Sequence, residues 1–176
     1  MFNETKLEIF EACDKDGNKL GLDMVRGEDH EDGLYHEVVE ILVVNHLNQV
    51  LVTKRDDKKL FPLYWEITGG SVIKGETTLE GAKRELLEET GLNALNLTLI
   101  YRSVEGDALF RGFITQVDSD KITLQKGETI DYKWLNPCDF IEFINREDFI
   151  PHARRRILSA WYLIEPVLFR NEDPEC

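Results

Sequence analysis

The chain has 176 residues, 42% of them hydrophobic, and a formal net charge of −13, so it can form one globular domain with a sizeable core. This acidic balance argues against general binding to a nucleic-acid polymer, which requires a basic face. We also expect neither a membrane span, which needs about 20 consecutive apolar residues, nor a signal peptide. Three separated cysteines without a zinc pattern favour reduced thiols and a cytoplasmic location; they are Cys13, Cys138 and Cys176.

The N-terminal part of the chain predicts strands. Residues 7–26 look like a hairpin, because two apolar runs flank a turn-rich segment. Residues 38–44 are β-branched and apolar enough for a buried strand, and residues 49–54 are expected to return after a turn. A charged loop follows, and then a short strand over residues 65–68.

Residues 70–92 predict a glycine-rich loop followed by a helix. Thr77 and Glu80 have the spacing of a capping box at the helix start. Gly91 is placed to end the helix. An apolar stripe should attach the helix to a core; it consists of Leu79, Ala82 and Leu86.

The remaining elements complete an α/β pattern. Three strands are expected over residues 96–103, 108–117 and 132–135. Residues 151–169 predict a C-terminal helix, which Pro166 should kink or end, and residues 154–156, three arginines, should form a solvated face. This order predicts an α/β sandwich. We expect a single domain over residues 1–176, with residues 1–26 as its N-terminal hairpin.

Three acidic residues crowd onto the helix predicted within 70–92. Glu85, Glu88 and Glu89 fall on one side at 100° per residue. Two such charges about 4 Å apart repel by about 4 kcal/mol at an effective dielectric near 20. A bound divalent cation would relieve this repulsion. The alternative is a solvated acidic face of a surface helix.

The same segment resembles the Nudix box, G-x5-E-x7-R-E-U-x-E-E-x-G-U, in which U is aliphatic. Every fixed position is matched, by Gly70, Glu76, Arg84, Glu85, Leu86, Glu88, Glu89, Gly91 and Leu92. The resemblance implies an α/β/α sandwich with a mixed β-sheet. It also implies a hydrolase that uses Mg²⁺ or Mn²⁺ to cleave a phosphoanhydride bond in a nucleoside diphosphate linked to another moiety, X.

The resemblance also implies roles for individual residues. Glu85, Glu88 and Glu89 would bind the metal, together with the backbone carbonyl of Gly70. Glu76 and Arg84 would hold the loop against the helix and so support the site. The substrate would be a small-molecule diphosphate, and many family members form homodimers.

A further acid acts as metal ligand or general base in many Nudix proteins. Glu128 lies in the corresponding region, before the strand expected at residues 132–135. The alternative for Glu128 is an ordinary surface acid. Glu105 and Asp107 are weaker candidates on another loop.

Residues 10–92 also resemble the isopentenyl-diphosphate isomerase-type branch of the family. The resemblance implies diphosphate contacts at Arg55 and Lys58, within a basic cluster whose alternative is a solvated loop. The isomerase cysteine is missing, because Gly69 stands at its position. His30 and His36 match metal-binding positions of the isomerases, but structural histidines are the commoner outcome. Isomerase activity and a non-catalytic Nudix-fold binding module are therefore the alternatives to hydrolysis.

Overall fold

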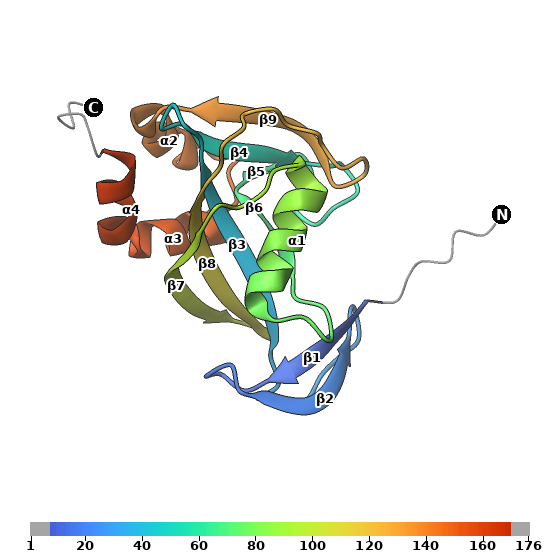
Figure 1. Cartoon of the computed structure of the whole chain (residues 1–176). Coiled ribbons are helices and arrows are strands. Elements are labelled where there is room, and N and C mark those ends of the chain that lie inside the picture. The colour runs from blue at the N-terminus through green and yellow to red at the C-terminus, as the bar shows by residue number, and fades with distance from the viewer. Residues whose placement is uncertain (1–7, 170–176) are drawn as a thin grey trace.

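The computed structural model describes residues 8–169 and contains an α/β arrangement of strands and helices (Figure 1). The strands are β1 (Ile9–Cys13), β2 (Lys19–Val25), β3 (His36–Val44), β4 (Val50–Arg55), β5 (Trp65–Glu66), β6 (Thr68–Ser71), β7 (Leu97–Glu105), β8 (Ala108–Gln116) and β9 (Thr129–Leu135). The helices are α1 (Thr78–Thr90), α2 (Pro137–Ile144), α3 (Pro151–Ser159) and α4 (Trp161–Leu168). Within residues 8–169, no helix is long and apolar enough to cross a membrane.

The central sheet is mixed, as predicted. Its strands follow the order β5-β4-β3-β8-β7, while β6 pairs with β3 and β9 pairs with β4. The β3–β8 pair is parallel, and the other pairs of this sheet are antiparallel. Strand β3 therefore runs through the middle of the sheet and meets the glycine-rich loop through β6.

Helices cover both faces of this sheet. Along β3, Leu42 and Val44 pack into a core with α2, α3 and α4. The alternate residues Ile41 and Val43 pack into a second core with α1. Because successive strand residues point to opposite faces, this split gives two helical layers around one sheet. The predicted α/β/α sandwich is confirmed.

Helix α1 has the predicted ends. The Thr77 hydroxyl accepts the N–H of Glu80, the Glu80 carboxylate accepts the N–H of Thr77, and Gly91 adopts the left-handed conformation (φ 74°) after the last turn. The predicted apolar stripe is correct for two of its three members, Ala82 and Leu86, which are fully buried. Leu79, in the first turn of α1, is 48% exposed, so the prediction is wrong for this residue.

The predicted N-terminal hairpin forms a small separate sheet, with β1 antiparallel to β2. It packs its own core of Phe10, Ala12 and Met24. Two lysines join it to the glycine-rich loop: Lys19 Nζ donates to the Glu76 carbonyl (3.1 Å), and Lys74 Nζ donates to Asp23 (2.7 Å). The hairpin thus lies beside the N-terminal end of α1 (Figure 1). The prediction of reduced thiols is confirmed for Cys13, which is free and buried. It is wrong for Cys138, which is disulfide-bonded, and Cys176 lies outside the described residues.

The C-terminal region differs from the prediction in two ways. Helix α2 was not predicted, although Asn136 caps it by accepting the Asp139 N–H (2.8 Å) and Pro137 starts it. The predicted helix over 151–169 is two helices, and the break falls at Ala160 (φ −105°) rather than at Pro166. Pro166 lies inside α4, where it has no N–H to donate to the carbonyl of Tyr162 four residues earlier.

The predicted solvated face at residues 154–156 is wrong for Arg156. Its side chain is only 6% exposed. It donates to both carboxylate oxygens of Glu40 on β3 (2.7 and 2.6 Å), and its guanidinium lies 3.8 Å from the Phe110 ring centroid. A bidentate carboxylate and an aromatic face stabilise this buried guanidinium, and its Nη1, which has no hydrogen-bond partner within residues 8–169, lies 2.8 Å from a Glu105 carboxylate oxygen. The periodicity of α3 did not reveal these partners, because both come from distant strands.

Candidate active site

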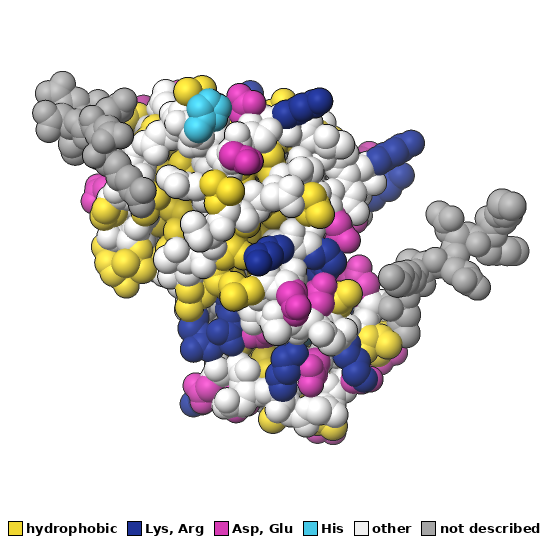
Figure 2. Space-filling view, viewed as in Figure 1, with side chains coloured by type: hydrophobic (Ala, Val, Ile, Leu, Met, Phe, Trp, Pro, Cys, Tyr) yellow, Lys and Arg dark blue, Asp and Glu magenta, His cyan; other side chains and the backbone are white. Residues whose placement is uncertain are grey.

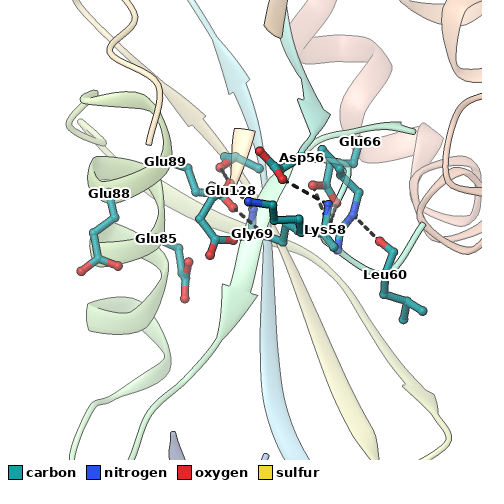
Figure 3. Close-up of polar contacts among 12 residues, drawn as sticks. Asp56, Lys58, Leu60, Glu66, Gly69, Glu85, Glu88, Glu89 and Glu128 are labelled. Atoms are coloured by element: carbon teal, nitrogen blue, oxygen red, sulfur yellow. Dashed lines mark hydrogen bonds and ion pairs between the residues drawn. The ribbon is translucent and has the colours of Figure 1, made fainter. Parts of the chain in front are cut away.

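Helix α1 carries the acidic residues of the site, and two of them point toward the glycine-rich strand β6. The Glu85 carboxyl group lies directly over Gly70, so that a Cβ at residue 70 would overlap it. The Glu89 carboxylate accepts the hydroxyl of Thr68 and the N–H of Gly69 (3.3 Å). Figure 3 shows Glu88 projecting away from Gly69, and its side chain is 47% exposed. The structure therefore places Glu85 and Glu89 against β6, and Glu88 at the rim.

Arg84 ties the loop to the helix. Its Nε and Nη2 donate to the two Glu76 carboxylate oxygens (2.6 and 3.0 Å), and Nη2 also donates to the Ser71 carbonyl (2.9 Å). Its Nη1 donates to Glu85 (2.8 Å) and Glu88 (3.1 Å). One guanidinium thus links the end of β6, the loop and two of the acidic residues, which fixes the position of Glu85.

Burial disfavours the charged form of the helix acids. Desolvation raises the pKa of Glu85 to about 7, against the lowering effect of Arg84, and Glu89 and Glu88 raise it further by repulsion. Desolvation is also the main reason that the pKa of Glu89 is raised, against a lowering hydrogen bond from Thr68. Two neighbouring carboxyl groups whose ionisation is disfavoured, half-buried Glu85 and buried Glu89, mark a candidate functional site.

The donor atoms of this site fit Mg²⁺ or Mn²⁺, both of which favour oxygen ligands. Glu85, Glu88 and Glu89 would supply carboxylates, and Gly70, whose backbone lies next to the Glu85 carboxyl group, would supply its carbonyl. Across residues 8–169, no three acidic, histidine or cysteine side chains are already arranged as a metal site. Arg84 and Thr68 hold the acids instead.

The loop after β4 places a lysine opposite the acids. Lys59 Nζ lies 3.8 Å from a Glu89 carboxylate oxygen and forms an ion pair with Glu128. The Glu128 carbonyl accepts the N–H of Asp56 (3.0 Å), which fastens the two loops together. The structure therefore brings Glu128 to the acids of α1. The sequence analysis predicts Lys58, and not Lys59, as a diphosphate contact. The conformation of the loop determines that Lys59 faces Glu89, and residue spacing does not reveal this.

The two basic residues predicted to bind diphosphate have different surroundings. Arg55 Nη1 donates to both Glu66 oxygens (2.8 and 2.7 Å), and its Nε donates to the Leu60 carbonyl (2.7 Å) (Figure 3). Burial raises the pKa of Glu66 to about 8, against the lowering effect of Arg55. Lys58 lines the same recess as the acids, so both predicted residues border the site and Arg55 also holds the loop.

A cleft with two ends connects these groups. The end at the acids has a volume of about 610 Å³, and we call it the acidic recess; it is lined among others by Glu85, Glu88, Glu89, Glu128, Lys58 and Lys59. A second cavity of about 350 Å³ adjoins it, and we call it the aromatic end; it is lined among others by Phe61, Glu105, Phe110, Ile150, His152 and Arg156. Both cavities share Lys59, Arg55 and residues 69–71, so they form one cleft.

The weaker candidates for a catalytic acid or metal ligand, Glu105, Asp107, His30 and His36, lie away from the acids of α1. Glu105 is at the aromatic end, where it pairs with Arg156 (2.8 Å), and Asp107 accepts the His36 N–H through its carbonyl. His36 stacks on Phe10 at 4.8 Å, and burial lowers its pKa. His30 Nε2 lies 3.1 Å from the Val25 carbonyl. Both histidines thus have structural partners near the hairpin. Figure 2 shows acidic and basic side chains mixed over α1 and the hairpin, without a basic field on this face.

Comparisons with known proteins identify relatives of this chain and proteins of the same fold. An uncharacterized Nudix hydrolase of Listeria monocytogenes is 29% identical over 152 residues, which cover 83% of this chain and 90% of the relative. An uncharacterized Nudix hydrolase of Listeria innocua is 34% identical over 134 residues, which cover 73% of this chain and 79% of the relative. The crystal structure of DR0079 from Deinococcus radiodurans shows the same fold, with a TM-score of 0.68 at 18% identity, over 90% of this chain and 98% of that chain.

The isomerase-type branch stays a prediction from residues 10–92. The assignment of the chain to a family does not depend on this branch. The NUDIX domain family matches residues 34–159, a range that contains the acidic helix, the glycine-rich strand and most of the cleft. The chain therefore belongs to the Nudix family.

Proposed function

We propose that this chain is a hydrolase, dependent on Mg²⁺ or Mn²⁺, that cleaves a phosphoanhydride bond in a nucleoside diphosphate linked to a moiety X. The observation that carries this proposal is the pair of carboxyl groups, half-buried Glu85 and buried Glu89, which lie against the glycine-rich strand β6 at one end of a cleft and whose pKa values are raised. The relatives named as Nudix hydrolases support it.

Glu85, Glu88 and Glu89 would hold the metal, with the carbonyl of Gly70. A divalent ion in such a site neutralises charge on phosphate oxygens and lowers the pKa of a bound water. Arg84 and Glu76 would keep Glu85 in place by the hydrogen bonds described above. They act as positioning residues, because Arg84 donates to Glu85 and Glu76 accepts from Arg84.

Glu128 would serve as the general base. Its carboxylate is held in the acidic recess by Lys59. It would take one proton from a water molecule while the water oxygen forms a bond to phosphorus. The bond between that phosphorus and the bridging oxygen breaks, and the leaving group departs as a phosphate. General-base assistance of this kind contributes about 10²–10⁴ in rate.

Lys59, Lys58 and Arg55 would bind the phosphate oxygens. All three line the acidic recess, and Lys59 and Arg55 also line the aromatic end. The net charge of −13 repels an anion at long range, but salt screens that field beyond about 8 Å. Contacts within the cleft must therefore supply the affinity for a diphosphate.

The isomerase alternative is disfavoured by the backbone at Gly69. A Cβ at this position would overlap the carbonyl oxygen of Val39 on the neighbouring strand. A cysteine cannot be placed here unless β3 or β6 shifts. The alternative of a non-catalytic binding module is disfavoured by the complete acidic set, since a module that only binds has no need of the helix acids and Glu128 together.

The test is turnover of a substrate panel by purified protein. The panel contains nucleoside diphosphates, nucleotide sugars, dinucleotides and coenzyme A, each with Mg²⁺, with Mn²⁺ and with excess chelator. We expect at least one substrate to be hydrolysed with either metal and none with chelator. Full activity in chelator, or no hydrolysis of any substrate, would contradict the proposal. Proton exchange into isopentenyl diphosphate, which we expect to be absent, tests the isomerase alternative.

The family resemblance further predicts a homodimer of single-domain chains in the cytoplasm. Light scattering coupled to size-exclusion chromatography checks the oligomeric state. A mass near 20.4 kDa, the mass of one chain, would contradict the dimer.

A further inference from the structure

We propose that Lys59 is the counter-ion of Glu89 and Glu128 in the metal-free protein, and that it must leave these carboxylates for a divalent cation to bind. This inference rests on the proposed function, because it concerns the cation site of the same cleft. Lys59 thus exchanges with the metal, and its departure frees the carboxylate of Glu128, the proposed general base. One side chain therefore couples metal binding to the release of the base.

Glu89 is a buried acid whose two carboxylate oxygens are already engaged. The residue is only 3% exposed. Its Oε2 accepts the hydroxyl of Thr68 and the N–H of Gly69 (3.3 Å). Its Oε1 lies 3.8 Å from Lys59 Nζ. A carboxylate that is removed from water requires a partner of opposite charge, and in the metal-free protein Lys59 supplies that charge.

The other basic side chains that line the acidic recess do not neutralise Glu89 or Glu128. Three arginines pair with other acids: Arg84 with Glu76, Glu85 and Glu88, Arg55 with Glu66, and Arg26 with Glu8. Lys58 lines the recess, but it forms no ion pair with any residue of 8–169. Figure 3 shows Glu89 and Glu128 side by side, and Lys59 pairs with both. Within the described part of the chain, Lys59 is therefore their one cationic partner.

The backbone around Lys59 is fixed, whereas its side chain has room to move. The Asp56 N–H donates to the Glu128 carbonyl (3.0 Å), and the Lys59 N–H donates to the Asp56 carbonyl (3.3 Å). Arg55 Nε fixes the next residue by donating to the Leu60 carbonyl (2.7 Å). A lysine carries its charge on a flexible stem. Lys59 lines both the acidic recess and the aromatic end, so its ammonium can move along the cleft while the loop stays in place.

Repulsion between like charges explains why Lys59 and the metal exclude each other. A cation held by Glu85 and Glu89 shares the Glu89 carboxylate with the Lys59 ammonium. The Lys59 side chain is only 22% exposed, so water screens this repulsion weakly. Movement of the ammonium away from Glu89 relieves the repulsion and leaves Glu128 without its partner. The alternative is that Lys59 stays in place and supports the metal ligands, and removal of its charge would then weaken metal binding.

Calorimetric titration of the metal-free protein with Mn²⁺, at one pH and without substrate, separates these alternatives. Lys59→Met keeps an apolar stem and removes the charge, and we expect it to bind Mn²⁺ about tenfold more tightly than the wild type, because the competing state is lost. Lys59→Arg keeps the charge and should stay within about threefold of the wild type. Lys58→Met is the matched control, because it removes the same charge from the neighbouring residue, and it should tighten binding by less than about threefold.

Amine labelling of the wild type provides a second measurement that needs no variant. Trace acetic anhydride followed by tandem mass spectrometry reports the labelling rate of each lysine, and Mn²⁺ should increase the rate at Lys59 but not at Lys58. An unchanged rate at Lys59 would overturn the inference. So would a Lys59→Met variant that binds Mn²⁺ no more tightly than the wild type or than Lys58→Met. These outcomes leave the proposed hydrolysis intact, and a failure of hydrolysis in the substrate panel leaves this test unaffected, because no substrate is present. Failure of every protein to bind Mn²⁺ would overturn both.

Discussion

The half-buried acid Glu85 should make the metal-free protein less stable as the pH rises. Its pKa is raised from 4.5 to about 7, so the folded state binds the proton more tightly than the unfolded state. The stabilisation is fully present below pH 4.5 and is lost as the pH rises through about 7. At 1.36 kcal/mol per pKa unit, the loss is about 3 kcal/mol. The side chain is 15% exposed, which makes this value an upper estimate.

Glu85→Gln should remove that loss, since glutamine does not titrate. The assay is urea unfolding in chelator at about pH 5 and about pH 8, with the free energy of unfolding extrapolated to water. The wild type should lose more stability than Glu85→Gln between these pH values, by up to about 3 kcal/mol. Glu66 and Glu89, whose pKa values are also raised, lower the stability of both proteins as the pH rises. The difference between the two proteins therefore reports Glu85 together with its repulsion of Glu89 and Glu88.

Glu88→Gln is the matched control, because Glu88 lies on the same helix with its side chain 47% exposed. It should keep the wild-type pH dependence. Adding Mg²⁺ at about pH 8 should restore the stability of the wild type, because the ion binds only the folded state. Parallel pH profiles for the wild type and Glu85→Gln would refute the reasoning from burial.

Three other predictions concern the cleft. Glu128→Gln should lower turnover by about 10²–10⁴ with little change in metal affinity, and unchanged turnover in steady-state kinetics would remove Glu128 as the base. Lys59→Ala should raise KM more than Lys58→Ala, because Lys59 faces Glu89 and Glu128; kinetics across a salt series check this, and equal KM values would contradict it. Gly70→Ala should displace the Glu85 carboxyl group and weaken metal binding measured by calorimetry, whereas wild-type metal affinity would show that the loop adapts.

The sequence predicted the parts of the fold that depend on local patterns. The capped helix α1 and the buried strand β3 carry their own signals, in the Thr77–Glu80 capping box and in a run of β-branched residues. Helix α2 also carries a local signal, the capping residue Asn136 followed by Pro137, although the sequence analysis above does not predict this helix. The break at Ala160 has no comparable local signal, since the apolar spacing continues through it.

The same distinction between local and distant signals applies to the residues of the site. The acids of α1 follow from a motif whose members are neighbours on one helix. The aromatic end does not, because Phe61, Phe110 and Arg156 come from a loop, a strand and a helix that meet only in the folded protein. The sequence analysis places Arg156 on a solvated face because its partners are not its neighbours in the sequence. Its partner Glu40 lies 116 residues away in sequence, and no periodicity within α3 identifies it.

The most direct test of the metal-dependent hydrolase is the turnover number of Glu85→Gln and Glu89→Gln at saturating Mg²⁺ on the best substrate of the panel. Both variants should fold, as judged by circular dichroism, since glutamine keeps the shape of the buried side chain. Each removes a carboxylate charge from the cation site, and we predict that turnover falls by at least about 10³, or about 4 kcal/mol in activation free energy. Turnover within about threefold of the wild type in both folded variants would contradict the account.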